Sequence, residues 1–144
     1  MIIIRRFKPS DFPSIVDIER KVFKEHDPYL YMQFYETCAD GFIVAEINGT
    51  VIGYVVGYQI SEHIGRVFSI AVYPKYQNRG IGSCLLKEII RVLSKYGVSQ
   101  IILEVRQSNL KAKRFYERHG FIQTGIAKHY YSNGENAYLM KLKI

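Results

Sequence analysis

Residues 68–86 read FSIAVYPKYQNRGIGSCLL. The apolar and β-branched run that ends at Val72 predicts a strand, and Pro74 stops it. From Gly82 onward apolar residues recur at helical spacing. Two glycines, at 80 and 82, flank Ile81 where this helix begins. The stretch therefore predicts a strand, a short loop and a helix.

The loop has the features of a phosphate-binding turn. Glycine lacks a Cβ, so a ligand can approach the backbone closely. The first turn of a helix has unpaired N–H groups and a partial positive charge, which together favour a pyrophosphate. Lys75 and Arg79 add positive charge, and Ser83 adds a hydroxyl donor. The alternative is a tight strand-to-helix turn in which the glycines only permit the backbone conformation.

Outward from this stretch, hydrophobic periodicity predicts elements along the whole chain. Predicted strands cover 2–7, 42–47, 51–60, 66–72, 100–105, 121–131 and 137–144, and predicted helices cover 12–24 (capped by Ser10-Asp11), 29–38, 82–95 and 109–118. Asn48-Gly49 supplies the positive φ angles of a tight hairpin, Gly97 is a candidate helix C-cap, and Gly120 ends a helix. The order predicts a mixed α/β sheet. No linker is seen, so we expect a single domain over 1–144.

The net charge of +7 and the pI of about 9.4 suggest anionic partners. Phosphates, nucleic acid or the ribosome surface would fit, and so would charges spread over solvated helix faces. No block of five like charges and no RNA-binding signature is present, so we do not expect direct nucleic-acid recognition. No apolar run is long enough for a membrane helix. We expect a cytoplasmic protein with no membrane partner.

The cysteines and histidines form no metal-binding pattern. Cys38 and Cys84 belong to no C-x-x-C pair, and no histidine cluster lies near them, so we expect no metal. A disulfide between them would be unusual in the cytoplasm. Cys84 falls within an apolar helical pattern, which predicts a small buried side chain. The spacing of the four histidines gives no reason to assign them a role.

Two common nucleotide-binding motifs are absent from the loop. A Walker loop requires G-x-x-x-x-G-K-[ST], and a dinucleotide fingerprint requires a third glycine where this chain has Leu85. The pattern that remains is Q-x-x-G-x-G, formed by Gln77, Gly80 and Gly82. It resembles motif A of the GNAT superfamily of acetyltransferases, whose signature is (Gln/Arg)-x-x-Gly-x-(Gly/Ala).

A second block supports this resemblance. Residues 103–121, LEVRQSNLKAKRFYERHGF, resemble the next strand and helix of the superfamily. The similarity is closest to RimI-type ribosomal-protein alanine acetyltransferases and to archaeal and eukaryotic amino-terminal acetyltransferases. It covers the whole chain loosely and residues 66–140 closely. It implies a mixed α/β (α+β), mostly antiparallel twisted sheet with a splayed central strand pair, flanked by helices on both faces.

The resemblance also implies acetyl-CoA as the acetyl donor. The residues that match the superfamily's cofactor contacts are the main chain of the fourth strand, the loop, and two residues of the later helix: Ile70, Ala71, Val72, Gln77, Asn78, Arg79, Gly80, Ile81, Gly82, Ser83, Asn109 and Tyr116. The oxyanion donor is expected to be a backbone N–H near Ala71 or Val72. Asn109 can also serve as a helix N-cap.

Acetyl transfer to an amine needs a base, because an ammonium group has no lone pair, and an acid for the leaving thiolate. Glu104 matches the general base of RimI-type enzymes, acting directly or through water. It shares a strand face with Arg106, so the alternative is an ion pair between these two or a cap on a neighbouring loop. Tyr116 matches the superfamily's acid, and its alternative is a core aromatic. A neutral phenol can donate a proton.

The acceptor site is expected to lie outside these blocks. Residues 129–140, HYYSNGENAYLM, resemble the YYxxGEDAY segment of amino-terminal acetyltransferases, which implies that Tyr130 and Tyr131 hold the substrate backbone. The alternative is a hairpin with its aromatic side chains on the sheet face. Asn136 replaces the usual Asp, which removes a charge. Glu25 lies where the family has its first substrate loop, and it could equally be a surface carboxylate.

The sequence therefore predicts acetylation of a primary amine, foremost the N-terminal α-amine of a protein, with a ribosomal protein as one expected target. A lysine side chain, a polyamine or a small-molecule amine is the alternative acceptor, since one fold serves all of these. A CoA-binding or RNA-associated module without turnover is the non-enzyme alternative. Glu104 and Tyr116 count against it.

Overall fold

The computed structural model describes residues 1–144 and contains seven strands and four helices. The strands are β1 (Ile2–Arg6), β2 (Phe42–Ile47), β3 (Thr50–Gln59), β4 (Ile64–Val72), β5 (Gln100–Arg106), β6 (Ile122–Ala127) and β7 (Ala137–Lys143). The helices are α1 (Phe12–Val22), α2 (Tyr29–Thr37), α3 (Ile81–Ser94) and α4 (Leu110–Arg118). Every predicted helix and strand is present.

Hydrogen bonds join the strands in the order β1-β2-β3-β4-β5-β7-β6. The pairs β1–β2, β2–β3, β5–β7 and β6–β7 are antiparallel, and β4–β5 is parallel. The parallel register covers only three residues of β4, Ile64, Gly65 and Arg66. The prediction of a mixed, mostly antiparallel sheet is confirmed.

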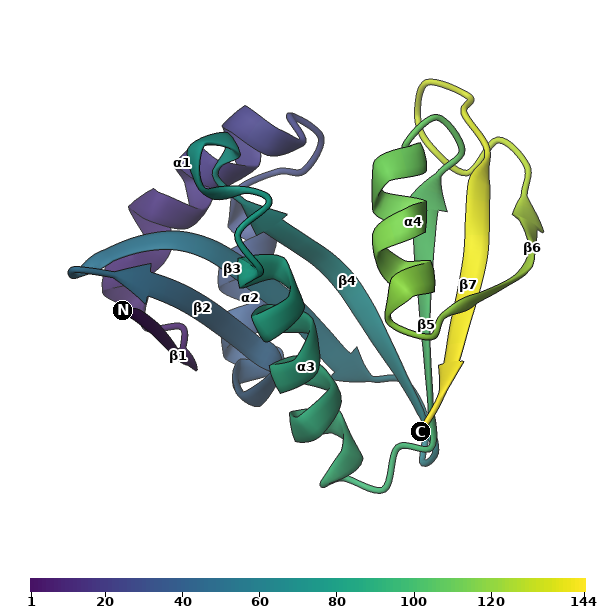
Figure 1. Cartoon of the computed structure of the whole chain (residues 1–144), viewed down its shortest axis with the longest axis horizontal. Helices are drawn as coiled ribbons and strands as arrows, with labels where there is room; N and C mark the ends of the chain where they lie inside the picture. The colour runs from purple at the N-terminus through teal and green to yellow at the C-terminus, as the bar shows by residue number, and fades with distance from the viewer. The chain divides into compact units, whose positions relative to one another are not determined.

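The chain divides into two compact units, and the first comprises Met1–Tyr58 and Val67–Tyr96. It holds β1, β2, β3 and the second part of β4, with α1 and α2 on one face of these strands and α3 on the other (Figure 1). Aromatic side chains fill the first face. Phe7 stacks on Phe42 with ring centroids 4.2 Å apart, and Tyr31 meets Tyr54 edge-on. The face toward α3 is aliphatic, which explains the strong apolar stripe of that helix.

The second unit comprises Gln59–Arg66 and Gly97–Ile144. It holds the first part of β4 together with β5, β7 and β6, and α4 packs on one face of these strands (Figure 1). Side chains of β5 alternate between buried and half-buried, with Ile101, Leu103 and Val105 buried. Because the period is two, Glu104 and Arg106 lie on the opposite face.

Turn residues have the predicted backbone geometry at two places, and a third residue lies beyond its predicted place. Asn48 and Gly49 both have positive φ, as a tight hairpin between β2 and β3 requires. Gly120, with φ of +92°, directly follows the last residue of the α4 cap. Gly97 also has positive φ, but α3 ends at Ser94 and its C-cap is Lys95, so the expected C-cap was two residues late.

The predicted cap of α1 is confirmed in position, because Asp11 is the N-cap residue, but its side chain does not cap the helix. A 3₁₀ turn occupies Pro9–Asp11 before the helix begins, and the Asp11 side chain makes no capping bond to α1. Its carboxylate instead accepts the Lys8 N–H at 2.9 Å and two bonds from the Arg5 guanidinium at 2.8 and 2.9 Å. An ion pair with β1 has therefore replaced the local cap.

Two further predictions are wrong. Cys84 is exposed, because it lies on the solvent side of α3 next to the buried pair Leu85 and Leu86. Both cysteines are free thiols. Strand β6 ends at Ala127, four residues before the predicted end, so Tyr130 and Tyr131 belong to a loop and not to the sheet face.

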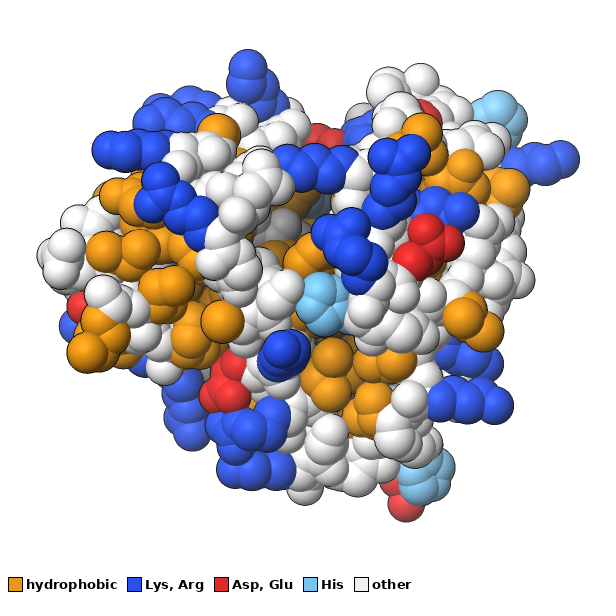
Figure 2. Space-filling view, viewed as in Figure 1, with side chains coloured by type: hydrophobic (Ala, Val, Ile, Leu, Met, Phe, Trp, Pro, Cys, Tyr) orange, Lys and Arg blue, Asp and Glu red, His pale blue; other side chains and the backbone are white.

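The positive charge is unevenly distributed. Helix α4 carries four basic residues, Lys111, Lys113, Arg114 and Arg118, against one acidic residue, Glu117. In the view of Figure 2, blue side chains gather over this helix. No helix has the length and apolar character required to cross a membrane.

Gly41 offers a direct test of this packing. A Cβ at Gly41 would overlap the backbone carbonyl of Gly57 on β3, and backbone cannot turn aside as a side chain can. We expect Gly41→Ala to lower the free energy of unfolding by about 1–3 kcal/mol, measured by urea denaturation. Gly125→Ala is the control, because its nearest atom is Leu139 Cδ1 at 3.7 Å, and it should change by less than about 0.5 kcal/mol. Equal stability of the two variants would contradict the packing.

Candidate active site

The loop between β4 and α3 turns through two left-handed residues. Asn78 has φ of +63°, and Gly80, the N-cap of α3, has φ of +81°. A Cβ on Gly80 would meet no atom within 4 Å, so glycine is required here by its backbone angle and not by crowding. The same observation shows that the backbone at Gly80 is open on that side, as the approach of a ligand requires.

The N-terminus of α3 offers unpaired donors. The first backbone bond of the helix is donated by Cys84 to the Gly80 carbonyl at 3.1 Å. The N–H groups of Ile81, Gly82 and Ser83 precede it and have no acceptor four residues earlier within the helix. Arg79 lies 5.3 Å from the centroid of the Tyr76 ring, and Lys75 lies 5.7 Å from it, so two cations flank one aromatic side chain of the loop. These groups can hold a phosphate-rich ligand.

Gln77 joins the loop to the end of β4. Its Nε2 donates to the Val72 carbonyl at 2.9 Å. The Tyr73 N–H donates to Ile52 on β3 at 2.9 Å, so by the alternation of a strand the Ala71 N–H faces β3 and the Val72 N–H faces the other edge. Of the two expected oxyanion donors, only Val72 then has an N–H directed away from β3.

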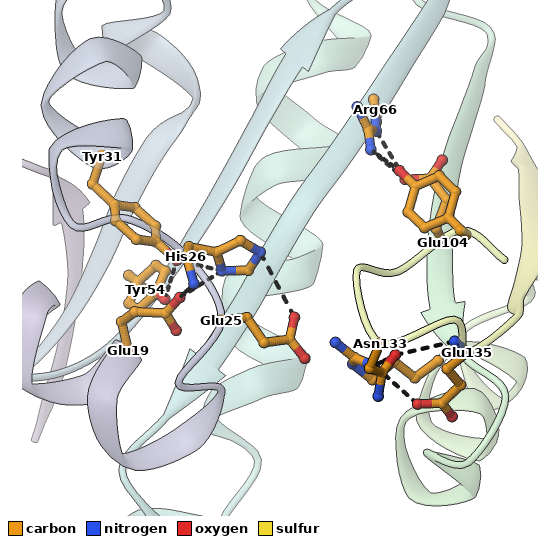
Figure 3. A network of polar contacts seen from close by, with 11 residues as sticks. Glu19, Glu25, His26, Tyr31, Tyr54, Arg66, Glu104, Asn133 and Glu135 are labelled. Atoms are coloured by element: carbon orange, nitrogen blue, oxygen red, sulfur yellow. Dashed lines mark hydrogen bonds and ion pairs between the residues drawn. The ribbon is translucent and has the colours of Figure 1, made fainter.

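In the same unit, Glu25 lies in the turn between α1 and α2. Its side chain is 24% exposed, and its Oε2 lies 3.9 Å from His26 Nε2. The other ring nitrogen of His26 contacts the carboxylate of Glu19. Glu25 is therefore not an isolated surface carboxylate but part of a group of ionisable side chains (Figure 3).

In the second unit, Glu104 is held by two neighbours. Arg66 donates to Glu104 Oε1 from Nε at 3.0 Å and from Nη2 at 2.5 Å. The Tyr130 hydroxyl lies 3.4 Å from the same oxygen and accepts a bond from Arg66 Nη2 at 2.9 Å. The side chain of Glu104 is 14% exposed. Burial, and secondarily the charge of Glu104, raises the pKa of Tyr130, so its hydroxyl stays protonated.

The alternative in which Glu104 pairs with Arg106 is wrong. Arg106 Nη1 donates to Glu135 at 2.9 Å and to Asn133 Oδ1 at 3.2 Å. Its guanidinium lies 4.0 Å from the centroid of the Tyr131 ring. The two residues share a face of β5 but have different partners. Arg66, on the adjacent parallel strand, is the residue that meets Glu104.

Tyr116 and Asn109 lie on or next to α4. Tyr116 is buried, with its ring 5.2 Å from Phe115 and 5.5 Å from Phe121. Burial raises the pKa of Tyr116 well above its ordinary value, and Tyr131 adds to the shift. Asn109 Oδ1 accepts the Ala112 N–H at 3.1 Å, so the N-cap alternative is confirmed. The amide nitrogen of Asn109 takes no part in this bond.

The loop between β6 and β7 is held in place by many bonds. Tyr130 and Tyr131 pack edge-on at 5.0 Å. Asn136 Oδ1 accepts the His129 N–H at 3.0 Å, while its Nδ2 donates to Gln107 Oε1 at 3.2 Å. An aspartate could not make this second bond, because it has no donor. The asparagine that departs from the family pattern therefore ties the loop to the end of β5.

Arg66, Glu19 and His26 were missed by reasoning from sequence. Arg66 opens an otherwise apolar strand segment, and an isolated charge there is the signal that could have indicated it. The contacts of Glu19 and His26 have no signature, because seven residues separate them across a helix end. The structure contains no group of three or more His, Cys, Asp or Glu side chains that could hold a metal ion.

Comparison with known proteins agrees with this geometry. The sequence profile of the acetyltransferase (GNAT) family matches residues 10–121. The chain belongs to the GNAT family. An uncharacterized N-acetyltransferase of Methanocaldococcus jannaschii is 38% identical to it, covering 96% of this chain and 90% of that protein. An N-alpha-acetyltransferase of Sulfurisphaera tokodaii is 33% identical, covering 95% and 90%.

A bacterial relative and a solved structure extend the comparison. The ribosomal protein bS18 alanine N-acetyltransferase of Escherichia coli K12 is 30% identical, covering 98% of this chain and 97% of that one. The crystal structure of Ard1 from Thermoplasma volcanium has a TM-score of 0.95 at 30% identity, covering 99% and 97%. The predicted family and GNAT-type fold are confirmed, and the chain is an N-acetyltransferase by family.

Tyr116 can be tested without turnover. Because its folded pKa is raised, its phenol should stay protonated through the range around 10.0 where an ordinary tyrosine ionises, and its contribution to stability is lost only as the pH rises beyond that range. Tyr116→Phe should leave the ultraviolet titration of the native protein unchanged there. Tyr29→Phe is the control, since the Tyr29 side chain is 73% exposed to solvent. Equal losses in both variants would show that Tyr116 is accessible.

Proposed function

We propose that this protein transfers the acetyl group of acetyl-CoA to the N-terminal α-amine of a protein. The observation that carries the proposal is the loop before α3, where Gly80 is left-handed and open and the first N–H groups of the helix are unpaired, in a chain that belongs to the GNAT family. A helix N-terminus of this kind is suited to a pyrophosphate.

Acetyl-CoA would be held by the loop before α3 and by residues that match the family's cofactor contacts. The N–H groups of Ile81, Gly82 and Ser83 would face its phosphates, with Arg79 adding charge. The main chain of Ile70, Ala71 and Val72, the polar loop residues Gln77 and Asn78, and the side chains of Asn109 and Tyr116 complete the proposed contacts. Bound acetyl-CoA supplies an activated acetyl thioester. Gln77 would act by keeping the Val72 carbonyl paired, which fixes the Val72 N–H as the donor for negative charge on the thioester oxygen.

Glu104 is the proposed base, directly or through a water molecule. Both bonds from Arg66 and the contact from Tyr130 go to Oε1, which leaves Oε2 to accept a proton from the amine. The Arg66 pair holds the side chain in one orientation. Tyr130 shares this network, so a substrate that contacts its hydroxyl would also be aligned with Glu104.

Tyr116 is the proposed acid. Burial keeps its hydroxyl protonated at neutral pH, so it can give its proton to the departing thiolate. An acceptor that arrives as an ammonium ion loses two protons, one to Glu104 Oε2 and one to solvent. The sulfur takes the proton of the Tyr116 hydroxyl, and Tyr116 regains a proton from solvent before the next turnover.

The acceptor is proposed from the relatives and from the fixed loop. Relatives named for α-amine and for ribosomal-protein alanine acetylation both cover nearly the whole chain. Tyr130 and Tyr131 would contact the first residues of the substrate, and Glu25 would attract its ammonium group. A ribosomal protein made in the cytoplasm is one target that fits.

A panel of acceptors tests the proposal. We expect acetyl transfer from radiolabelled acetyl-CoA to peptides that begin with Ser, Ala or Met. Peptides with a blocked N-terminus and one internal lysine, and spermidine, are the controls and should react at least about tenfold more slowly. Preference for lysine or spermidine would identify a different acceptor amine. Absence of acetyl transfer to every peptide would show that the N-terminal α-amine is not the acceptor.

Two substitutions test the proton path. Glu104→Gln keeps an oxygen for Arg66 but cannot take a proton, and Tyr116→Phe keeps the ring but not the hydroxyl. Each should lower kcat by about 10²-fold or more, with acetyl-CoA affinity nearly unchanged. Glu117→Gln is the control, because Glu117 is an exposed carboxylate of α4 whose nearest cation is Lys113 at 3.7 Å. Wild-type kcat in either test variant would remove that residue from the mechanism.

A further inference from the structure

One residue of α1, Glu19, holds the turn that follows the helix. Its backbone carbonyl accepts the N–H groups of Phe23 and Lys24, each at 2.9 Å. Its side-chain Oε1 accepts the His26 N–H at 2.8 Å and contacts His26 Nδ1 at 2.5 Å. Three of the four residues 23–26 are therefore bound to Glu19. The fourth is Glu25, whose Oε2 lies 3.9 Å from His26 Nε2.

The turn presents Glu25 in a defined place. Lys24 has φ of +58°, a left-handed angle that a lysine rarely adopts, so the backbone reverses just before Glu25. In Figure 3 the His26 ring lies between the two carboxylates, with Nδ1 toward Glu19 and Nε2 toward Glu25. The ring is packed at 5.0 Å from Phe68 and 5.7 Å from Phe23, which limits its rotation.

The buried carboxyl group of Glu19 lowers the stability of the fold unless its bonds have another role. Its side chain is only 3% exposed, and its Oε2 is a buried oxygen with no hydrogen-bond partner. The Ser69 hydroxyl is the other buried side-chain group of this kind. An unpaired buried acceptor costs about 1–3 kcal/mol, a cost that an apolar residue of similar volume would not have. Glu19 makes two bonds that hold His26 in place, and an apolar residue could not make them.

The aromatic hydroxyls beside this group do not supply those bonds. Tyr31 and Tyr54 bond to each other at 2.8 Å, and Tyr31 OH is 3.4 Å from His26 Nδ1. Burial raises the pKa of both tyrosines, so they stay neutral. Among the groups described around His26, Glu19 is thus the acceptor that makes short bonds to both its backbone and its ring.

We propose that Glu19 is a positioning residue for the acceptor amine. By fixing His26 and the turn, it sets where the Glu25 carboxylate meets the incoming ammonium group. The inference rests on the proposed function in one respect, the assignment of Glu25 to the acceptor. It extends that function by naming a buried residue of α1 that determines affinity for the amine and not for the acetyl donor.

Steady-state kinetics separate this role from a general structural one. Glu19→Leu removes both side-chain bonds at similar volume, and it should raise KM for the acceptor by about tenfold or more while KM for acetyl-CoA stays within about twofold. His26→Asn keeps a donor near the position of Nδ1, so it should retain most of the affinity. Glu36→Gln, an exposed carboxylate of α2, is the control and should match the wild type. Equal rises in both KM values for Glu19→Leu would overturn the proposal.

A double-mutant cycle tests whether Glu19 acts through Glu25. Once Glu25→Gln has removed the proposed amine contact, adding Glu19→Leu should raise the acceptor KM little further. Fully additive effects would show that the two residues act independently and would overturn the positioning role. Glu19→Gln provides a second variant if the leucine variant folds poorly, and it should show the same pattern with a smaller amplitude.

Amide hydrogen exchange tests the tether without any substrate. In Glu19→Leu the His26 N–H should exchange much faster than in the wild type, while Ile15 and Ile18 within α1 stay protected. Unchanged protection at His26 would overturn the proposal. If the wild type proves to acetylate lysine or spermidine, the same KM comparison is made with that amine. Failure of the N-terminal assignment then appears in the wild-type panel, and failure of this inference appears only in the comparison of variants.

Discussion

The short parallel ladder between β4 and β5 is the constraint on which the site depends. It joins only Ile64, Gly65 and Arg66 of β4 to β5, so Arg66 is its last residue. Because parallel strands keep a fixed register, this ladder brings the Arg66 guanidinium to Glu104, two residues further along β5 than its own partner. The remainder of β4 pairs in the first unit, and its final N–H and carbonyl at Val72 lead directly into the loop before α3. One strand therefore orients the proposed base and begins the proposed phosphate-binding loop.

Local features of the site could be predicted from sequence because their causes are local. The glycine-containing turn at Gly80 before a helix and the Asn48-Gly49 hairpin each depend on neighbouring residues, and both are found. The partner of Glu104 could not be predicted, because 38 residues separate it from Arg66 and only strand register brings them together. The alternation of side chains along β5 correctly predicted that Glu104 and Arg106 lie on one face. It could not show that Arg106 bonds to Glu135 and packs on the Tyr131 ring.

The end of β6 shows how a loop can compete with a strand. The run after Ala127 contains two tyrosines, which favour strands, and a period-two pattern would continue through them. His129 instead has φ of +52°, and its N–H donates to Asn136 Oδ1. Arg106 donates to Asn133 Oδ1, and both bonds stabilise the loop conformation. The segment that the family resemblance assigns to the substrate is therefore rigid through side-chain bonds and not through the sheet. The catalytic, cofactor-binding and substrate-binding assignments stay predictions until they are measured.

Two carboxylates of this chain share one arrangement and differ in a single respect. In both Glu104 and Glu19, Oε1 takes every bond described and Oε2 takes none. Glu104 is 14% exposed, so its free oxygen can exchange a proton with water or with an amine. Glu19 is 3% exposed, and its free oxygen is cut off from solvent, so a proton would have no route to leave. Because a base must be regenerated after each turnover, the first geometry suits proton transfer and the second suits only the holding of a neighbour. The difference in exposure, and not the identity of the residue, divides the two roles.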